Sequence, residues 1–184
     1  MNYVEPLRSK EHITQIEEYL SKINKRDRLI FVFGINTGLR VSDILLLNIG
    51  DVKDKKSVVI REKKTGKYKK FPLNKKLIRL INEYLQCIPL CKLNTPLFTG
   101  DKGSRLHRSM VYKFLNNTAN KLKLEVGAIG THTMRKTFGY HHYKKFNDVA
   151  LLQQILNHSS PSVTLRYIGI SQEEIDLSYK NFEL

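Results

Sequence analysis

Residues 57–73, SVVIREKKTGKYKKFPL, form the stretch that decides the fold of this chain. Its first part, 57–61, is rich in β-branched residues and predicts a strand. The KTGK segment at 64–67 has the composition of a turn, and residues 68–73 return as a second strand. The stretch therefore predicts a small β-hairpin.

On both sides of this hairpin, apolar residues recur at helical spacing. Before it, the pattern predicts helices over 9–23, 28–37 and 42–49, and Gly38 is a stop signal. After it, the same spacing predicts further helices, which cover 75–85, 109–122, 132–143, 149–156 and 162–167. Ser171–Glu174 is a capping box for a last short helix.

The chain shows no internal repeat, low-complexity stretch or Pro/Gly/Ser linker. We therefore expect a single domain over residues 1–184. Its fold class should be α+β, predominantly helical, with one small β-hairpin.

The charge balance indicates the class of partner. The 184 residues include 32 Lys and Arg against 17 Asp and Glu, which gives a formal net charge of +15. A field of this sign attracts polyanions and raises their encounter rate. It favours a nucleic acid as partner, while a merely basic surface, or packing on RNA as in ribosomal proteins, is the alternative interpretation.

Targeting signals and metal-binding patterns are absent from the sequence. No apolar run approaches the roughly 20 residues of a membrane span, and residues 1–6 lack the layout of a secretory signal. We expect a cytoplasmic, nucleoid-associated chain without a membrane partner. Cys87 and Cys91 have no second pair of soft ligands, so they are expected to be free thiols and no metal site is expected.

Four separated segments carry side chains that can act on a phosphate group. In the first, TGLRVSD at 37–43, Arg40 follows a glycine at the mouth of a predicted helix, where its planar fork can point at a phosphate. Asp43 lies three residues further, close enough to orient Arg40 or a neighbouring histidine. Taken alone, a surface Arg–Asp pair is the better interpretation.

The second segment is the hairpin turn, EKKTGK at 62–67. A lysine on a turn can reach into a groove and give a proton to a departing oxygen. On the residues alone, a basic hairpin that contacts phosphates only by charge is the better interpretation. The lysines that crowd it are Lys63, Lys64, Lys67, Lys69 and Lys70.

The third segment is THTMR at 131–135. His132 and Arg135 lie three residues apart, so a helix puts them on one face. Thr131 is expected to be the N-cap, which places both side chains near a helix N-terminus, where anions are favoured.

The fourth segment is LNHSSP at 156–161, followed by TLRY at 164–167. Ser160 is expected to cap a short helix with Pro161 at its first position. Tyr167 then lies near the end of that helix, nine residues after His158. Most tyrosines at such places pack their ring at the edge of the core and leave the hydroxyl in water. A functional role for Tyr167 is favoured by the presence of the other three segments.

In their order and spacing, TGLR, the KTGK turn, HTMR, LNHSS and T-x-x-Y resemble the tyrosine recombinase, or phage integrase, family. The similarity runs from Lys10 to the last predicted helix. It implies the catalytic-domain fold of that family and a site-specific recombinase or integrase. Such an enzyme cleaves and rejoins DNA through a 3′-phosphotyrosyl intermediate.

The resemblance assigns the cations of the pattern. Arg40 and Arg135 match the paired arginines that clamp the scissile phosphate. Lys64 matches the hairpin lysine that acts as general acid on the leaving 5′ oxygen, and Asp43 takes the place of a supporting carboxylate. The other hairpin lysines are expected to contact DNA.

The resemblance also assigns the remaining groups. His132 matches the histidine that helps take the proton of the nucleophile, His158 matches a position that bonds a non-bridging oxygen, and Tyr167 matches the nucleophile. A phenol with a pKa near 10 needs such help to attack phosphorus. Because a lysine protonates the leaving oxygen and the phosphotyrosine retains the bond energy, neither metal nor ATP nor another cofactor is implied.

The sequence departs from the family pattern in three places. Asn157 stands where many relatives have glycine, and Lys136 stands where histidine is frequent. The residues before Arg40 are too few for the helical core-binding domain that members usually carry. A short form without that domain is expected, either a natural remnant or an excised catalytic domain; relatives that resemble fimbrial-switch invertases are also short.

The resemblance implies double-stranded DNA as partner, with a tetramer on DNA and a monomer when free. Two other functions are open at this point. A type IB topoisomerase-like or telomere-resolving enzyme shares the chemistry, and a non-catalytic DNA-binding regulator acts by occupancy. The small size argues against the former, and the intact set of catalytic residues argues against the latter.

Overall fold

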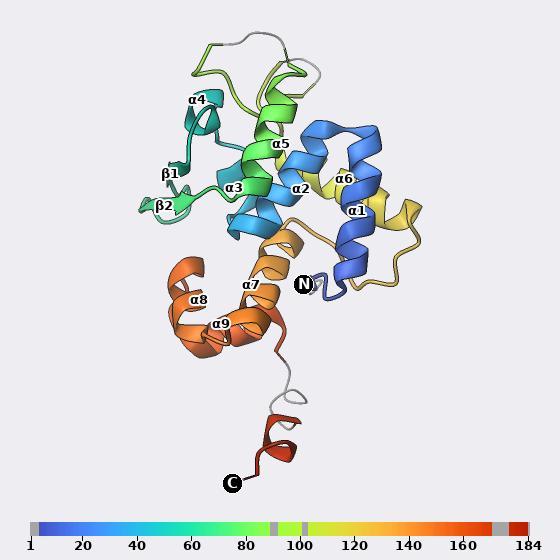
Figure 1. The fold of residues 1–184 in the computed structure, drawn as a ribbon, viewed down its shortest axis with the longest axis vertical. Helices are drawn as coiled ribbons and strands as arrows, with labels where there is room; N and C mark the ends of the chain where they lie inside the picture. The colour runs from blue at the N-terminus through green and yellow to red at the C-terminus, as the bar shows by residue number, and fades with distance from the viewer. Residues whose placement is uncertain (1–3, 89–91, 101–102, 171–176, 184) are drawn as a thin grey trace.

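The computed structural model of the chain describes residues 4–88, 92–100, 103–170 and 177–183. Over these residues the fold is predominantly helical with one antiparallel hairpin, as the sequence predicted (Figure 1). The elements in chain order are α1 (Lys10–Ile23), α2 (Lys25–Thr37), α3 (Val41–Ile44), α4 (Ile49–Val52), β1 (Ser57–Arg61), β2 (Tyr68–Pro72), α5 (Lys75–Leu85), α6 (Arg108–Lys121), α7 (Thr133–Phe146), α8 (Val149–Leu156) and α9 (Pro161–Ile168).

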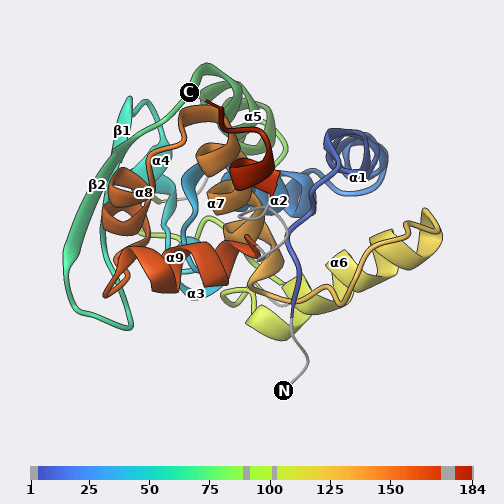
Figure 2. The same cartoon turned by 90° about the horizontal axis from the view of Figure 1, so that it is seen from below.

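Helix α2 lies at the centre of the larger hydrophobic core. Its residues 29–33, LIFVF, are almost completely buried, because α1, α5 and α7 pack against it from different sides. Figure 2 shows α2 between α1 and α7. A helix that is apolar around most of its circumference is typical of such an interior position.

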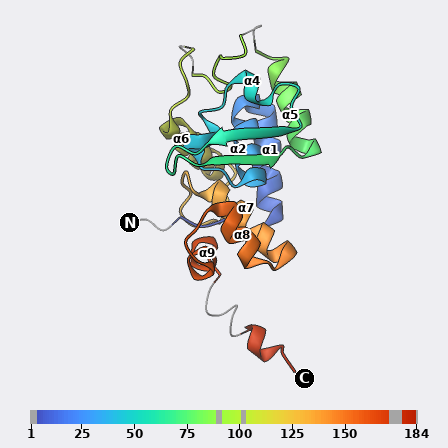
Figure 3. The same ribbon diagram turned by 90° about the vertical axis from the view of Figure 1, so that its left-hand side faces the viewer.

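The hairpin rests on this core through its first strand. Val58 and Ile60 of β1 are buried, and β1 pairs with β2 so that Ser57 lies opposite Pro72 and Arg61 opposite Tyr68. Strand β2 is the outer strand. Figure 3 shows the hairpin from outside, with α8 and α9 on the side of its lower edge.

Helix α7 connects the larger core to a smaller one. Its Met134 packs so closely on α2 that a Cβ at Gly34 would lie 2.8 Å from the Met134 Cβ. Further along α7, the smaller core of Leu152, Leu156 and Ile168 is formed by α8 and α9. Both helices pack on α7. His158 follows the end of α8, and Tyr167 lies in the last turn of α9.

Two sequence predictions about local structure are wrong. The expected helix over 42–49 ends early: α3 stops at Ile44, and α4 begins only at Ile49, where the Asp51 carboxylate accepts the N–H of Asn48 and caps the new helix. Thr131 is not the N-cap of α7, since that place is taken by His132. The Thr133 hydroxyl instead accepts the N–H of Gly130, which fixes the turn before the helix.

Other features agree with the sequence or lie outside the described residues. Ser160 caps α9 by accepting the N–H of Val163, and Pro161 is at the first turn, as predicted. The expected capping box at 171–174 and Cys91 lie outside the described residues, whereas residues 177–180, where the last short helix was expected to continue, are helical and Cys87 is a free thiol. Within the described ranges, no helix has the length and apolar character needed to cross a membrane.

The left-handed turn at Gly38 predicts a stability effect. Gly38 has φ of 63°, and an added Cβ would clash with the Phe138 ring. Gly38→Ala should lower the free energy of unfolding by about 1–2 kcal/mol for the backbone and by a further ~1–3 kcal/mol for overpacking. Urea denaturation measures the loss.

Gly103 offers the matched control for this prediction. Its φ is also positive, at 73°, but nothing lies within 4 Å of an added Cβ. Gly103→Ala should therefore show only the backbone cost of about 1–2 kcal/mol. Equal losses in the two variants would contradict the close packing of Phe138 on the turn.

Candidate active site

Arg40 is held by two buried carboxylates. It follows the left-handed turn at Gly38 and takes the N-cap position of α3. Its NH1 lies 3.0 Å from Glu62 Oε1 and 3.8 Å from Asp43 Oδ2. Since both carboxylate side chains are nearly inaccessible to solvent, the guanidinium supplies the charge that their burial requires. These contacts bring the loop after α2 and the hairpin together.

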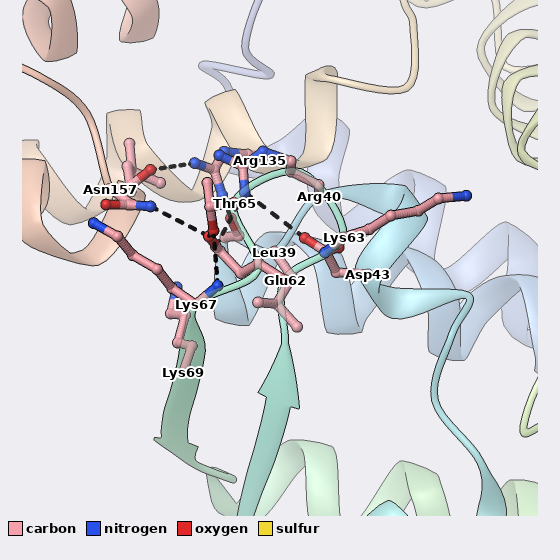
Figure 4. Close-up of polar contacts among 12 residues, drawn as sticks. Leu39, Arg40, Asp43, Glu62, Lys63, Thr65, Lys67, Lys69, Arg135 and Asn157 are labelled. Atoms are coloured by element: carbon pink, nitrogen blue, oxygen red, sulfur yellow. Dashed lines mark hydrogen bonds and ion pairs between the residues drawn. The ribbon is translucent and has the colours of Figure 1, made fainter.

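Glu62 is a site residue that the sequence reasoning missed. Its Oε2 accepts hydrogen bonds from Thr65 Oγ1 at 2.7 Å and from Asn157 Nδ2 at 3.3 Å (Figure 4). Burial alone would raise the pKa of Glu62, but the Thr65 bond, the Arg40 charge and the Asn157 bond together hold it below its ordinary value. The available signal was that Glu62 is the one acidic residue in the basic stretch 57–73.

Asp43 links α3 to the hairpin turn. Its Oδ1 accepts the backbone N–H of Lys63 at 3.0 Å, while the Lys63 side chain points away from Glu62 (Figure 4). Lys64 is exposed next to it in the turn. Its ammonium is nevertheless near enough to help lower the pKa of both His132 and His158.

The other hairpin lysines fall into two groups. Lys63, Lys67 and Lys70 are exposed, so they are free to meet a polyanion. Lys69 is part-buried, and its Nζ donates to the carbonyl of Ile155 at 2.7 Å. Burial and the nearby charge of Arg135 lower the pKa of Lys69 to about 8.

Arg135 is buried at the meeting point of three chain segments. From α7, its NH1 donates to the carbonyl of Gly38 at 2.6 Å, and its NH2 donates to the carbonyl of Leu156. A guanidinium carries five N–H donors in a fixed plane. Two are used to hold α7 against the ends of α2 and α8, and the guanidinium also hydrogen-bonds the side chain of Tyr167.

Tyr167 lies beside His132. The Tyr167 hydroxyl is 3.2 Å from His132 Nδ1, and the ammonium of Lys136 lies 5.2 Å from the centre of the Tyr167 ring. Burial raises the pKa of Tyr167, although Arg135 and Arg40 oppose this rise. Burial, reinforced by Arg135 and Lys136, lowers the pKa of His132. The imidazole is thus kept neutral, the form that can accept a proton.

His158 packs against the same tyrosine. The ring centroids of His158 and Tyr167 are 4.8 Å apart, and His158 Nδ1 is 3.2 Å from Thr164 Oγ1. Burial and the charges of Arg135, Arg40 and Lys64 lower the pKa of His158 to about 4. This imidazole is neutral near pH 7.

The arrangement gathers cations and proton carriers around one hydroxyl. Arg40, Arg135, His132, His158 and Tyr167 come from separated segments and form one cluster, with Lys64 at its edge on the hairpin. Excess positive charge at a tyrosine hydroxyl suits attack on an anionic phosphodiester. Among the described residues, no group of three or more His, Cys, Asp or Glu is arranged to hold a metal ion.

The lowered pKa of His158 predicts a pH effect on stability. An unfolded histidine has a pKa of about 6.5, against about 4 in the folded protein. Between these values the unfolded chain binds a proton that the folded protein does not, so the free energy of unfolding decreases as pH falls through this window. His158→Asn should therefore lose less stability than the parent between about pH 7 and about pH 5. Urea titrations measure both losses; identical losses would contradict the buried, neutral imidazole.

Comparison with known proteins shows the family of the chain. A profile of the phage integrase family matches residues 8–174. The probable integrase/recombinase YoeC of Bacillus subtilis is 44% identical over 183 residues, which cover 99% of this chain and 98% of YoeC. The tyrosine recombinase XerC of Pelobacter propionicus is 30% identical over 150 residues. That match covers 82% of this chain and 49% of XerC, so the chain spans about half the length of this relative.

Solved structures show the same fold. The site-specific recombinase XerH, in a post-cleavage complex with a palindromic difH substrate, superposes with a TM-score of 0.76 at 25% identity, covering 97% of this chain and 53% of XerH. The XerA recombinase superposes with a TM-score of 0.80 at 19% identity, covering 100% of this chain and 68% of XerA. The family profile spans most of the chain, and its match confirms what the motifs predicted. This chain belongs to the phage integrase family of tyrosine recombinases.

Proposed function

We propose that the chain is a site-specific DNA recombinase that acts as one catalytic domain and cleaves and rejoins DNA through Tyr167. The observation that carries this proposal is the 3.2 Å distance between the Tyr167 hydroxyl and His132 Nδ1, inside a cluster that contains Arg40 and Arg135. A phenol activated in this way can attack a phosphodiester. The product is a 3′-phosphotyrosyl bond and a free 5′ hydroxyl.

Each side chain then has a distinct role in the reaction. Arg40 and Arg135 bind the non-bridging oxygens of the scissile phosphate, and the neutral His132 takes the proton of Tyr167. His158 bonds a non-bridging oxygen of the same phosphate. Lys64 protonates the leaving 5′ oxygen, so the chain's own residues supply each proton transfer. Rejoining reverses these steps with another 5′ hydroxyl as attacker.

Double-stranded DNA is the proposed partner. XerH was solved with its difH substrate, and lambda integrase as a dimer on a core site. The formal net charge of +15 and the exposed lysines of the hairpin, Lys63, Lys67 and Lys70, suit contacts to phosphates. Such contacts depend steeply on salt, since each neutralised phosphate releases counterions.

We further propose a tetramer on DNA and a monomer when free, in association with the nucleoid. The exposed apolar side chains at the end of the described chain support assembly: Leu177 is 57% and Phe182 68% accessible to solvent. Exchange of this segment with a neighbouring copy would cover both side chains.

Removal of the nucleophile provides the direct test of the function. Tyr167→Phe removes the hydroxyl and keeps the ring that packs on His158, so covalent attachment to DNA should be abolished while DNA binding stays within about threefold of the parent. A suicide duplex with a nick beside the cleavage site traps the adduct, which a denaturing gel detects. A denaturant-resistant adduct formed by the variant would contradict the assignment, and Tyr140, Tyr143 and Tyr179 would then be tested.

A second test separates the general acid from the phosphate clamp. A substrate with sulfur at the 5′ bridging position has a leaving group that needs no protonation. It should therefore rescue Lys64→Ala, whose loss on the oxygen substrate is expected to be about 10²–10⁴-fold, and it should not rescue Arg40→Ala. Rescue of Lys63→Ala in place of Lys64→Ala would move the general acid by one residue.

A further inference from the structure

The C-terminal end of α8 is bound by side chains from elsewhere in the chain. The last carbonyls of a helix have no partner within it, and cations are favoured there. Lys69 of β2 donates from its Nζ to the Ile155 carbonyl at 2.7 Å, and Arg135 of α7 donates to the next carbonyl, that of Leu156. The hairpin thus contacts α8 across 86 residues of sequence.

The residue that ends α8 makes a second contact with the hairpin. Asn157 has φ of 51° and ψ of 52°, the left-handed conformation that glycine takes most easily and asparagine next. Its side chain adds what glycine lacks, an Nδ2 that donates to Glu62 Oε2 at 3.3 Å. The other oxygen of Glu62 faces Arg40.

The Lys69–Ile155 and Asn157–Glu62 bonds connect the hairpin, which carries Lys64, to the segment that leads to Tyr167. On one side, the hairpin carries Lys64, and its outer strand β2 has the exposed neighbours Tyr68 and Lys70 beside Lys69. On the other side, His158 directly follows Asn157, and α9 with Tyr167 begins three residues later. The hairpin, which carries Lys64 in its turn, is therefore bound to the end of α8 through Lys69 and Glu62.

We propose that Lys69 and Asn157 are positioning residues for the reaction, which together latch the hairpin to the end of α8 and so place Lys64 against the oxygen that leaves when Tyr167 attacks. This inference rests on the proposed function. Lys69 acts through its bond to the Ile155 carbonyl and not as a proton donor to DNA. A residue that places a catalytic group can control a large share of the rate, because small misplacements are costly.

Substitutions at Lys69 test the latch with a charge-matched control. Lys69→Met removes the bond, Lys69→Arg keeps a donor that is always protonated, and Lys70→Met removes the same charge from the adjacent exposed position. Single-turnover cleavage is measured at saturating suicide duplex, with oxygen or sulfur at the 5′ bridging position. Lys69→Met should be roughly 10- to 100-fold slower on the oxygen substrate and near the parent rate on sulfur. Lys70→Met should affect both substrates equally.

Two further variants complete the test. Lys69→Arg should stay within about threefold of the parent on both substrates, because arginine can bond the carbonyl but cannot serve as the general acid. Asn157→Gly keeps the left-handed backbone and loses only the bond to Glu62, so it should show a smaller loss with the same rescue by sulfur. Urea denaturation verifies folding, and Asn157→Gly alone carries the test if Lys69→Met does not fold.

Several outcomes would overturn the latch. If Lys69→Arg were as slow as Lys69→Met, Lys69 would be a proton donor. If Lys69→Met were equally slow on the oxygen and the sulfur substrate, Lys69 would not act through Lys64. An unchanged rate in Lys69→Met would also exclude it. Failure of sulfur to rescue Lys64→Ala would instead refute the general acid of the proposed function, which keeps the two failures distinguishable.

Discussion

The buried guanidinium of Arg135 is the interaction on which the rest of the site depends. A buried charge is tolerated only when it is well hydrogen-bonded, and Arg135 obtains its partners from the carbonyls of Gly38 and Leu156, which lie 97 and 21 residues away in sequence. These bonds fix the end of α2, the start of α7 and the end of α8 relative to one another. α2 and α8 end shortly before Arg40 and His158, and α7 begins directly after His132, so one side chain sets the mutual placement of these three site residues.

The carboxylates of Glu62 and Asp43 balance a site that is otherwise positive. Without them, Arg40 would face Arg135 and the hairpin lysines with no counter-charge. With them, the positive charge is still in excess. Burial, reinforced by this charge, lowers the pKa of His132 and His158 and keeps both neutral, while the charge opposes the rise in the pKa of Tyr167 that burial causes. The same electrostatic field thus serves two ends: it attracts a phosphate, and it leaves His132 in the form that accepts a proton.

The hairpin, the order of most helices and the residues of the cluster could be predicted because they follow from local patterns. Periodicity places helices, β-branched residues and a KTGK turn place the hairpin, and the resemblance of five motifs selects Arg40, Lys64, His132, Arg135, His158 and Tyr167. Glu62, Lys69 and Asn157 could not be assigned from the same information. Their contacts join residues 86 to 95 positions apart, and a lysine in a basic strand looks the same in sequence whether it faces DNA or a carbonyl. Thr131 failed as a cap because His132 takes that position, while Thr133 accepts the N–H of Gly130 in the turn before the helix; periodicity does not resolve a shift of one residue at a helix start.

The division of the site between two cores explains why its polar contacts matter so much. Arg40, Glu62 and the hairpin lie beside the larger core, whereas His158 follows α8 and Tyr167 lies in α9. The core of these two helices has, among the described residues, Leu152, Leu156 and Ile168 fully buried, with partly buried apolar side chains packed against them. Each fully buried apolar side chain stabilises the placement of the two short helices by about 1.5–3 kcal/mol, whereas a hydrogen bond adds about 0.5–1.5 kcal/mol net. Apolar packing therefore supplies most of the free energy, and the bonds from Arg135, Lys69 and Asn157 decide where the tyrosine lies relative to the arginines. Polar contacts of this kind are directional, so they fix the geometry more sharply than apolar packing of the same strength would.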